Sequence, residues 1–331
     1  MRRLAESEST LAPAKINLTL RVVGRRADGF HELESLVAFA PFGDRLTLWP
    51  GSPLDLKVSG PMAAGAGPLT DNLVLRAVRA LAERIDGLKL GRFALAKRLP
   101  AGAGLGGGST DAAAALRLIA RANHLGLDDA RIHEAARATG ADIPVCLDPR
   151  PRMMRGIGEI LSAPATLPKL GILIVHPGVA VPTGSVFKAL GLAPGERYAT
   201  PALASCHFPS PSSGREKWGS ADTNSVPVSP TPPSPKTGRA ESTEKARREA
   251  LLTWFASERN DLEAAAIVIA PPIADVLGVI AGLAGCRLAR MSGSGSACFG
   301  LFDSARAATA AARTLGGARP SWWVRTGLLG D

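Results

Sequence analysis

The period of the hydrophobic pattern changes along this chain. Short runs rich in apolar and β-branched residues predict strands, and they occupy residues 16–23, 36–39, 45–49, 54–58, 92–97 and 172–178. Stretches rich in Ala, Leu and Arg, with apolar residues three and four positions apart, predict helices at residues 72–85, 109–122 and 128–138. We expect the first of these helices to be capped by Thr70 or Asp71. The first half is therefore predicted to be α+β.

The second half continues the alternation of helices and strands. Helical segments are expected at residues 184–190, 243–256, 260–268 and 272–283, and two apolar strand segments, at 289–302 and 322–327, flank a helix near 304–315. Residues 209–241 are instead rich in Pro, Ser, Gly and Thr, and their few apolar residues cannot offset the entropy lost on ordering. We predict a disordered insert there. A docking segment for SH3-like partners is the minor alternative, because PxxP-like strings arise readily in such a composition.

A glycine-rich segment follows the predicted strand at 92–97. Five of the seven residues from 102 to 108 are Gly, namely 102, 104, 106, 107 and 108. Glycines permit positive φ and let backbone N–H groups approach an anion closely, and the N-terminus of the alanine-rich helix that follows adds positive potential. The segment therefore predicts a polyphosphate cradle made of Pro100, Ala101, Gly102, Ala103, Gly104, Leu105, Gly106, Gly107, Gly108, Ser109 and Thr110.

Two common phosphate-binding patterns do not match this segment. No Lys follows any of its glycines as a Walker A loop requires, and the spacing differs from the GxGxxG of dinucleotide folds. A merely flexible turn is a further alternative. That alternative does not account for the helix-forming composition that follows the glycines.

The string PAGAGLGGGST resembles the ATP-phosphate motif of the GHMP kinase superfamily. Other segments agree in order with the members that phosphorylate a cytidine diphosphate-linked methylerythritol: PAKINLTL from Pro13, RRADGFHEL from Arg25, GADIP from Gly140, RGIGE from Arg155, HPG from His176, NDLE from Asn260 and MSGSGSAC from Met291. The similarity spans roughly residues 11–303 apart from the insert.

The resemblance implies a fold and an activity. It implies a two-domain GHMP kinase fold, with a ribosomal protein S5 domain 2-like domain at 1–165 and a ferredoxin-like α/β domain at 166–331. It also implies ATP- and Mg²⁺-dependent phosphorylation of the 2-hydroxyl of 4-diphosphocytidyl-2-C-methyl-D-erythritol, in the non-mevalonate route to isopentenyl diphosphate. A mevalonate- or homoserine-type kinase would use the same loop and stays an alternative.

The resemblance assigns catalytic roles to Lys15 and Asp142. Asp142 follows a predicted helix stop at Thr139-Gly140 and precedes Ile143-Pro144, so it opens a new element. An ammonium beside this carboxylate would keep it ionised as a base and counter the charge that develops during transfer. A surface salt bridge and a helix cap are the alternatives for these two residues.

The resemblance also implies an acceptor pocket. Phe30 and Phe187 are expected to stack on the cytosine ring, although the family commonly has Tyr at the first position. His31 would contact the base edge, Asn17 the erythritol or phosphate end, and Thr183 would offer a hydroxyl. From residue chemistry alone, His31 is more often structural and Phe187 more often part of a core.

The remaining candidates on the nucleotide side are hydroxyls and a second glycine loop. Mg²⁺ keeps waters and takes phosphate oxygens, so it needs few protein ligands. Ser109 or Thr110 is a candidate for one of them, and no metal ligand is assigned. The loop that begins at Met291 is expected to pack beside the phosphate loop, supporting it without taking part in the chemistry.

Composition bounds the class of protein. With 331 residues, 46% of them hydrophobic, the chain can bury a large core. Four cysteines, at 146, 206, 286 and 298, are too irregularly spaced for a zinc site or a disulfide framework. No apolar run is long enough to span a membrane and no signal peptide is evident. We therefore expect a cytoplasmic protein without a membrane partner. Composition does not choose between a monomer and a homodimer.

The chain is strongly basic, with a net charge of +10 and a pI of about 10.0. Its basic residues are scattered, without the basic runs or aromatic interleaving typical of nucleic-acid binding, and we expect no nucleic-acid partner. A non-catalytic protein that binds nucleotides or nucleic acid stays the second alternative. It would bind oligonucleotides in a salt-dependent way.

Overall fold

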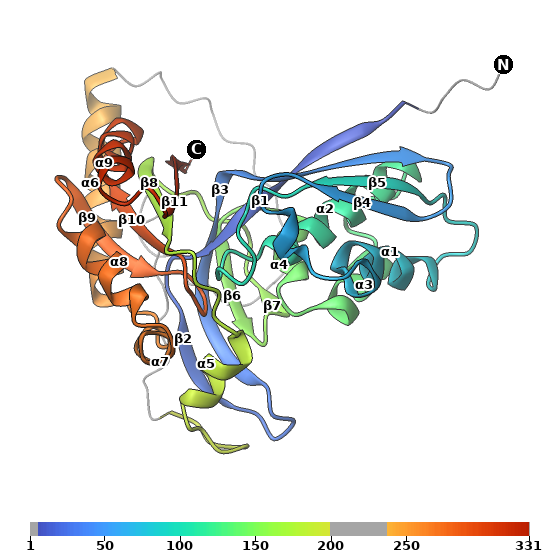
Figure 1. Ribbon diagram of the computed structural model, residues 1–331, viewed down its shortest axis with the longest axis horizontal. Coiled ribbons are helices and arrows are strands. Elements are labelled where there is room, and N and C mark those ends of the chain that lie inside the picture. Colours follow the sequence, from blue (N-terminus) through green and yellow to red (C-terminus); the bar gives the residue numbers. More distant parts are fainter. Residues whose placement is uncertain (1–5, 199–236, 331) are drawn as a thin grey trace, which may run out of the picture.

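The computed structural model describes residues 6–198 and 237–330, which form two sheets with helices packed against them (Figure 1). One sheet contains strands β1 to β7, which lie between residues 8 and 161, and the other contains β8 to β11, between residues 170 and 329. The division into domains at 1–165 and 166–331 stays a prediction.

The first sheet is organised around β3 (His31–Pro50), a strand of 20 residues. One edge of β3 pairs with β2 (Arg21–Arg25) and then β1 (Glu8–Asn17), and the other edge with β6 (Arg152–Gly156) and then β5 (Gly91–Ala96). The sheet is completed by β4 (Asp55–Ser59), parallel to β5, and by β7 (Ile160–Leu161), antiparallel to β6. The length of β3 lets a single strand connect the two ends of the sheet.

Three strand predictions in this sheet are corrected. The segments 36–39 and 45–49 are parts of one strand, β3. The predicted strand at 16–23 is interrupted, because β1 ends at Asn17 and β2 begins at Arg21. β1 also begins much earlier, at Glu8, where pairing of Glu8 with Leu48 holds a polar stretch in the sheet. Tertiary pairing has overridden local composition there.

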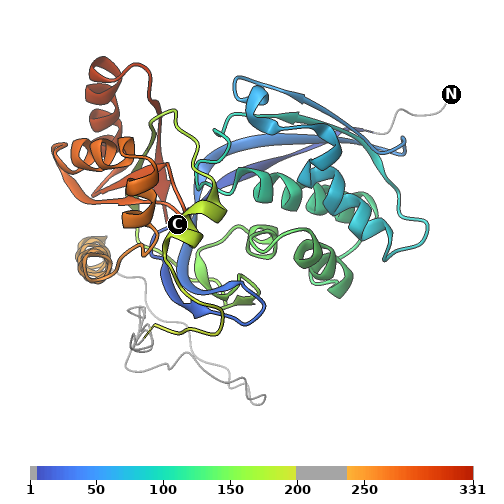
Figure 2. The same ribbon diagram turned by 60° about the horizontal axis from the view of Figure 1, so that its bottom comes forward.

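Helices cover one face of this sheet (Figure 2). They are α1 (Leu73–Ala82), α2 (Gly107–Ala122), α3 (Ala130–Thr139) and α4 (Ile143–Leu147), preceded by 3-10 turns at Ala63–Ala66 and Leu69–Asp71. The side chain of Asn72 caps α1 by accepting from the Val74 N–H, so the expected cap at Thr70 or Asp71 is wrong. Ala112 to Ala115 of α2 are fully buried, since small side chains let this helix lie close to the sheet and its neighbours.

The second sheet is antiparallel, with the order β11-β8-β10-β9. Its strands are β8 (Leu170–His176), β9 (Cys286–Met291), β10 (Cys298–Phe302) and β11 (Trp323–Leu329). If β8, β9, β10 and β11 are renumbered 1 to 4 in chain order, the sheet order becomes 4-1-3-2. This is the arrangement of a ferredoxin-like βαββαβ unit. The predicted segment 289–302 contains parts of two strands, because the loop at 292–297 separates β9 from β10.

The remaining helices belong to the second half of the chain. They are α5 (Thr183–Ala189), α6 (Thr237–Ser257), α7 (Glu263–Ile269), α8 (Pro272–Ala281) and α9 (Ala305–Ala318). Residues 237–241 lie in α6, so the predicted end of the insert is too late; Arg239, Ala240 and Glu241 are good helix formers. Residues 209–236 of the predicted insert lie outside the described residues.

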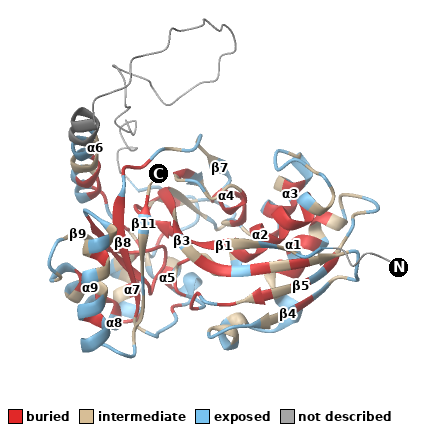
Figure 3. Ribbon diagram, turned by 90° about the horizontal axis from the view of Figure 1, so that it is seen from above, coloured by how far each residue is buried: buried red, intermediate tan, exposed pale blue. Residues whose placement is uncertain are grey.

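Figure 3 colours the buried residues red along the ribbon, and they occur in both sheets and in the helices against them. Buried side chains form three clusters, and one of them joins the two sheets. That cluster brings Ile16 and Leu36 of the first sheet against Ile172 and Phe299 of the second. The contact fixes the relative position of β1 and the loops that precede β10. Among the described residues, Cys146, Cys286 and Cys298 are free thiols, and no helix is long and apolar enough to span a membrane. Cys206 lies outside the described ranges.

Candidate active site

A cavity of about 1000 Å³ opens between the first sheet, the start of α2 and the N-terminus of α5. Its lining includes every site residue predicted from the sequence except Thr110. Thr110 is fully buried, and its hydroxyl donates to the carbonyl of Gly107 (3.0 Å) inside the first turn of α2. Ser109 therefore presents the hydroxyl that faces the cavity.

The phosphate loop, residues 100–109, combines a glycine turn with a helix start. Gly102, Gly104 and Gly106 have φ of 61°, 71° and 62°, the left-handed region that favours glycine. Gly107 and Gly108 do not, because α2 begins at Gly107, two residues earlier than predicted, with Gly106 as its N-cap. The first N–H groups of α2 have no partner within the helix, which makes them donors for an anion in the cavity.

Lys15 and Asp142 meet at the end of this loop. Lys15 Nζ lies 2.7 Å from Asp142 Oδ2, and the Lys15 backbone N–H donates to the carbonyl of Leu105 (2.9 Å). Lys15 is 4% exposed and the Asp142 side chain 38% exposed, so the cation is buried while the carboxylate is open to the cavity. A Cβ at Gly106 would lie 3.1 Å from Lys15 Cβ and Cε, so the glycine there also makes room for the lysine.

Asp142 stands at the N-terminus of α4 and makes no side-chain capping hydrogen bond. A cap would have turned its carboxylate back toward the α4 backbone. The carboxylate is instead directed at Lys15, and the alternative of a helix cap is therefore wrong.

The predicted acceptor residues line the same cavity from the other side. The rings of His31 and Phe187 pack together, with centroids 4.8 Å apart and planes tilted by 32°. Phe30 is 56% exposed on the turn between β2 and β3. Burial lowers the pKa of His31, with a further lowering from Arg25, and its Nε2 is buried without a hydrogen-bond partner. His31 thus presents a neutral ring with an unused nitrogen.

Asn17 and Thr183 are fixed by neighbours. The Asn17 side-chain amide donates to Ser35 Oγ (2.7 Å), which leaves its buried Oδ1 without a partner, and Asn17 is 2% exposed. An unpaired buried acceptor on a cavity wall is costly unless a ligand donates to it. The Thr183 hydroxyl lies 2.9 Å from that of Ser294, at the start of α5.

A buried charge cluster behind the phosphate loop was not foreseen from the sequence. Lys97 Nζ contacts Asp44 and lies 2.7 Å from Asp111 Oδ2, and all three residues are at most 5% exposed. Asp44 also accepts from the N–H of Leu99 (2.9 Å), tying the strand end to the loop. Burial raises the pKa of Asp111 to about 7, although Lys97 opposes the shift.

The second glycine loop, residues 292–297, lies directly against the first. The Ser292 hydroxyl donates to the carbonyl of Gly104 (3.0 Å) and accepts from the N–H of Asn17 (3.2 Å), and the Ala297 N–H donates to Ala103 (2.9 Å). Gly293 and Ser294 line the cavity. Further lining residues that the motifs did not point to are Gly65, Ala66, Asp71, Asn72 and Leu73, from the segment before α1.

Comparison with known proteins agrees with this geometry. The GHMP kinases N terminal domain matches residues 72–148, and the GHMP kinases C terminal domain matches residues 241–318. The 4-diphosphocytidyl-2-C-methyl-D-erythritol kinase of Xanthobacter autotrophicus is 52% identical over 318 residues, covering 96% of this chain and 97% of that protein. The enzyme of the same name from Methylobacterium radiotolerans is 52% identical over 319 residues, with the same coverage. The chain belongs to the 4-diphosphocytidyl-2-C-methyl-D-erythritol kinase family.

Two solved structures share the fold of this chain. A crystal structure of 4-(cytidine 5'-diphospho)-2C-methyl-D-erythritol kinase is 32% identical, with a TM-score of 0.69, and covers 98% of this chain and 100% of that one. A homoserine kinase from Cytophaga hutchinsonii superposes with a TM-score of 0.63 at 17% identity, over 100% of this chain and 97% of that one. At that identity the second match shows the fold alone. The predicted GHMP kinase fold and family are confirmed.

Proposed function

We propose that this protein transfers the γ-phosphoryl group of ATP to the 2-hydroxyl of 4-diphosphocytidyl-2-C-methyl-D-erythritol, with Lys15 and Asp142 as its catalytic residues. The contact that carries the proposal is the 2.7 Å ion pair between Lys15 Nζ and Asp142 Oδ2. It lies where the phosphate loop meets the acceptor wall, the part of the cavity lined by Asn17, Phe30, His31, Thr183 and Phe187. Relatives named for this activity match over nearly their full length.

In this proposal the triphosphate binds to the backbone N–H groups of residues 100–109. The Asp142 carboxylate accepts the proton of the acceptor hydroxyl, and the Lys15 ammonium offsets negative charge as the phosphoryl group moves. Transfer is direct, without a phosphoenzyme. Because Lys15 is buried, its attraction for Asp142 and for the phosphate is weakly screened by solvent.

Magnesium fits this site as a metal carried by the nucleotide. Within the described ranges, no cluster of three His, Cys, Asp or Glu residues is arranged to hold a metal ion. Mg²⁺ needs few protein ligands because it keeps waters and binds phosphate oxygens. Of the two candidate hydroxyls only Ser109 faces the cavity. Mg²⁺ held there would neutralise charge on the β- and γ-phosphates.

The acceptor wall supports a cytidine ring in this proposal. Phe187 and Phe30 offer aromatic faces, and the free Nε2 of His31 offers a partner for the base edge. The unpartnered Oδ1 of Asn17 is an acceptor for a hydroxyl of the erythritol. A mevalonate- or homoserine-type acceptor has no flat ring and would leave the aromatic wall unused.

Phosphate transfer from γ-labelled ATP tests the proposal. We expect the purified protein to label 4-diphosphocytidyl-2-C-methyl-D-erythritol at its 2-oxygen, located by phosphorus NMR, and to leave mevalonate and homoserine unlabelled. Labelling of mevalonate or homoserine in its place would overturn the assignment of the acceptor. ATP-independent binding of oligonucleotides at moderate salt, without any transfer, would favour the non-catalytic alternative.

A further inference from the structure

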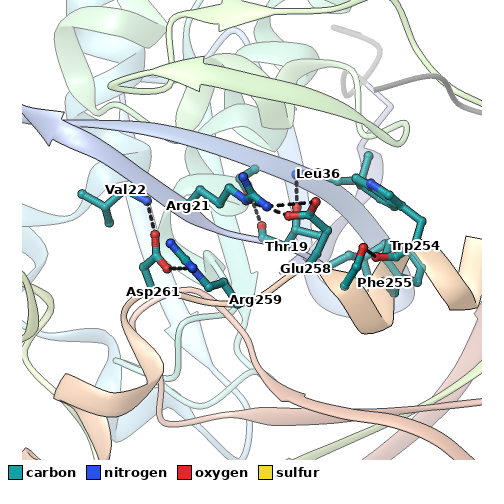
Figure 4. A network of polar contacts seen from close by, with 12 residues as sticks. Thr19, Arg21, Val22, Leu36, Trp254, Phe255, Glu258, Arg259 and Asp261 are labelled. Carbon is teal, nitrogen blue, oxygen red and sulfur yellow. Dashed lines mark hydrogen bonds and ion pairs between the residues drawn. The ribbon is translucent and has the colours of Figure 1, made fainter. Parts of the chain in front are cut away.

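The turn between α6 and α7, residues 258–262, connects the two sides of the site. Glu258 forms a bidentate ion pair with Arg21 of β2, at 2.8 and 3.3 Å, and Asp261 Oδ2 accepts from the N–H of Val22 (2.8 Å) (Figure 4). Glu258 is 7% exposed. These contacts hold the strand that leads into the turn carrying Phe30 and His31.

Asn260, in the middle of this turn, reaches in the opposite direction. Its side-chain amide Nδ2 donates to the carbonyls of Met291 (2.9 Å) and Gly293 (2.8 Å), and its Oδ1 accepts from the N–H of Leu262 (3.0 Å). The residue is 7% exposed. The orientation of the amide is unambiguous, because its two carbonyl partners require a donor and the backbone N–H requires an acceptor.

The loop that Asn260 holds contacts both substrate sides. Ser292 bonds to Gly104 of the phosphate loop and to the N–H of Asn17, and Ser294 bonds to Thr183. The approach to Gly104 is so close that a Cβ there would lie 2.3 Å from the carbonyl oxygen of Ser292. A small displacement of residues 291–293 must therefore move the phosphate loop, the acceptor wall or both.

We infer that Asn260 is a positioning residue for phosphoryl transfer: its amide fixes the second glycine loop in the place that aligns the triphosphate with the acceptor. The inference rests on the proposed function. Asn260 itself does not line the cavity, so it acts through the loop and is not a catalytic residue. Misplacement of reacting groups by about 1 Å can cost on the order of 100-fold in rate.

The variant Asn260→Asp isolates the donor role. A carboxylate keeps the oxygen that accepts from Leu262 but removes both N–H donors, and it places an oxygen against two carbonyls. We expect kcat per folded molecule to fall by about 10- to 100-fold, with KM for ATP and for the acceptor changing by less than about 3-fold. Circular dichroism and thermal melting would measure the folded fraction.

Asn123→Asp is the matched control. Asn123 likewise donates through Nδ2 to two backbone carbonyls, those of Lys89 (3.0 Å) and Ile119 (2.8 Å), and accepts from the Lys89 N–H (2.7 Å), but it lies at the far end of α2. The same chemical change there should leave kcat within about 2-fold of the original enzyme. Equal kcat values for the Asn260 and Asn123 variants, in an otherwise active enzyme, would overturn the inference.

The pH profile separates positioning from a general loss of structure. A carboxyl at position 260 would be buried against two carbonyl oxygens, which raises its pKa, and its protonated form regains one donor. The deficit in kcat of Asn260→Asp relative to the original enzyme should therefore shrink as the pH falls from 8 to 6. A deficit independent of pH contradicts the inference. If Asn260→Asp does not fold, Asn260→Ser, which keeps a side-chain oxygen that can accept from the Leu262 N–H, replaces it, and failure of both to fold assigns Asn260 a purely structural role and overturns the proposal.

The test distinguishes the two proposals. An original enzyme without transfer to the cytidine-linked acceptor refutes the proposed function. An active original enzyme whose Asn260 variant behaves like its Asn123 control refutes only the positioning role.

Discussion

The nucleotide side and the acceptor side of the cavity are built in different ways. The phosphate loop and the helix start that it leads into are one continuous segment, residues 100–109, whose backbone N–H groups we propose to bind the triphosphate. The acceptor wall takes its side chains from the ends of β1, β3 and α5, which are far apart in the sequence. A backbone site tolerates few changes at its glycines, whereas a side-chain site can change specificity one residue at a time.

The two sides of the cavity meet at Asp142. Replacement of this residue should lower kcat more than any other change considered below. We expect Asp142→Asn to lower kcat by about 10²- to 10⁴-fold, because the amide cannot accept the proton of the acceptor hydroxyl. KM for ATP should change little, since the loop backbone is untouched. Steady-state kinetics with both substrates varied would measure this.

Asp148→Asn is the control for that variant. Asp148 ends the same short helix, is similarly exposed at 40%, and pairs with Arg150 and Arg152 outside the cavity. Its variant should keep kcat within about 2-fold, because neither of its ion pairs faces the cavity. Near-normal turnover of Asp142→Asn would remove the carboxylate from the mechanism.

Gly104→Ala tests the backbone character of the nucleotide side. The φ of Gly104 is 71°, and a Cβ would lie 2.3 Å from a carbonyl oxygen and 2.9 Å from the Gly295 nitrogen. The atoms that the Cβ would meet belong to the backbone of the second glycine loop, and a side-chain rotation cannot relieve the collision. The phosphate loop must therefore shift, and we expect ATP affinity to fall at least about 10-fold. Isothermal titration with a non-hydrolysable nucleotide would measure it.

Gly87→Ala separates backbone strain from steric collision. Gly87 has a similar φ of 70°, but nothing lies within 4 Å of its added Cβ. That variant should lose about 1 kcal/mol of stability and bind nucleotide normally. Equal nucleotide affinity of Gly104→Ala and Gly87→Ala would show that nucleotide binding does not need the contact between the two glycine loops.

Phe187→Ala tests the side-chain character of the acceptor wall. Loss of one aromatic face should raise KM for the cytidine-linked acceptor by about 10-fold, equivalent to about 1.4 kcal/mol, and leave KM for ATP unchanged. Phe42→Ala is the control, because Phe42 is also half-buried against an aromatic ring, that of Trp323, but lies outside the cavity. A rise in KM for ATP as large as that for the acceptor would contradict the separation of the two sides.

The last prediction concerns stability and leaves activity aside, and it tests the charge cluster behind the phosphate loop. The pKa of Asp111 is raised by burial to about 7, so the folded state holds a proton that the unfolded state releases near pH 4. The stabilising contribution of this proton is complete below pH 4 and is lost as the pH rises through 7. Relative to Asp111→Asn, the free energy of unfolding should therefore fall with rising pH, by at most about 1.4 kcal/mol per pH unit.

Urea denaturation of both proteins at pH 5, 6 and 7 would measure this slope. Parallel stability profiles would show that Asp111 stays ionised beside Lys97. The described acceptor residues Asn17, Phe30, His31, Thr183 and Phe187 include no acid, so their replacement should leave this slope unchanged.

Sequence alone could indicate the phosphate loop because a glycine cluster before an alanine-rich helix is a local signal. The sequence could indicate Lys15 and Asp142 only through the resemblance to a family whose motifs occur in the same order. Nothing local shows that residues so distant in sequence come within 2.7 Å. The cluster of Asp44, Lys97 and Asp111 gave no signal, because isolated charged residues in a sequence usually indicate solvent exposure.

The sequence alone determined the local features of the backbone and their positions along the chain. These are the glycines that bend the backbone, the alanines that form a helix, and the segments that alternate as strand and helix. The tertiary structure alone decided that β3 is one strand of 20 residues and that Gly107 and Gly108 are helical. It also decided that Thr110 turns inward and that Asn260 supports a loop from another part of the chain. The physical reason is that pairing, burial and hydrogen-bond satisfaction depend on neighbours distant in sequence, whereas φ preferences and helix propensity reside in each residue.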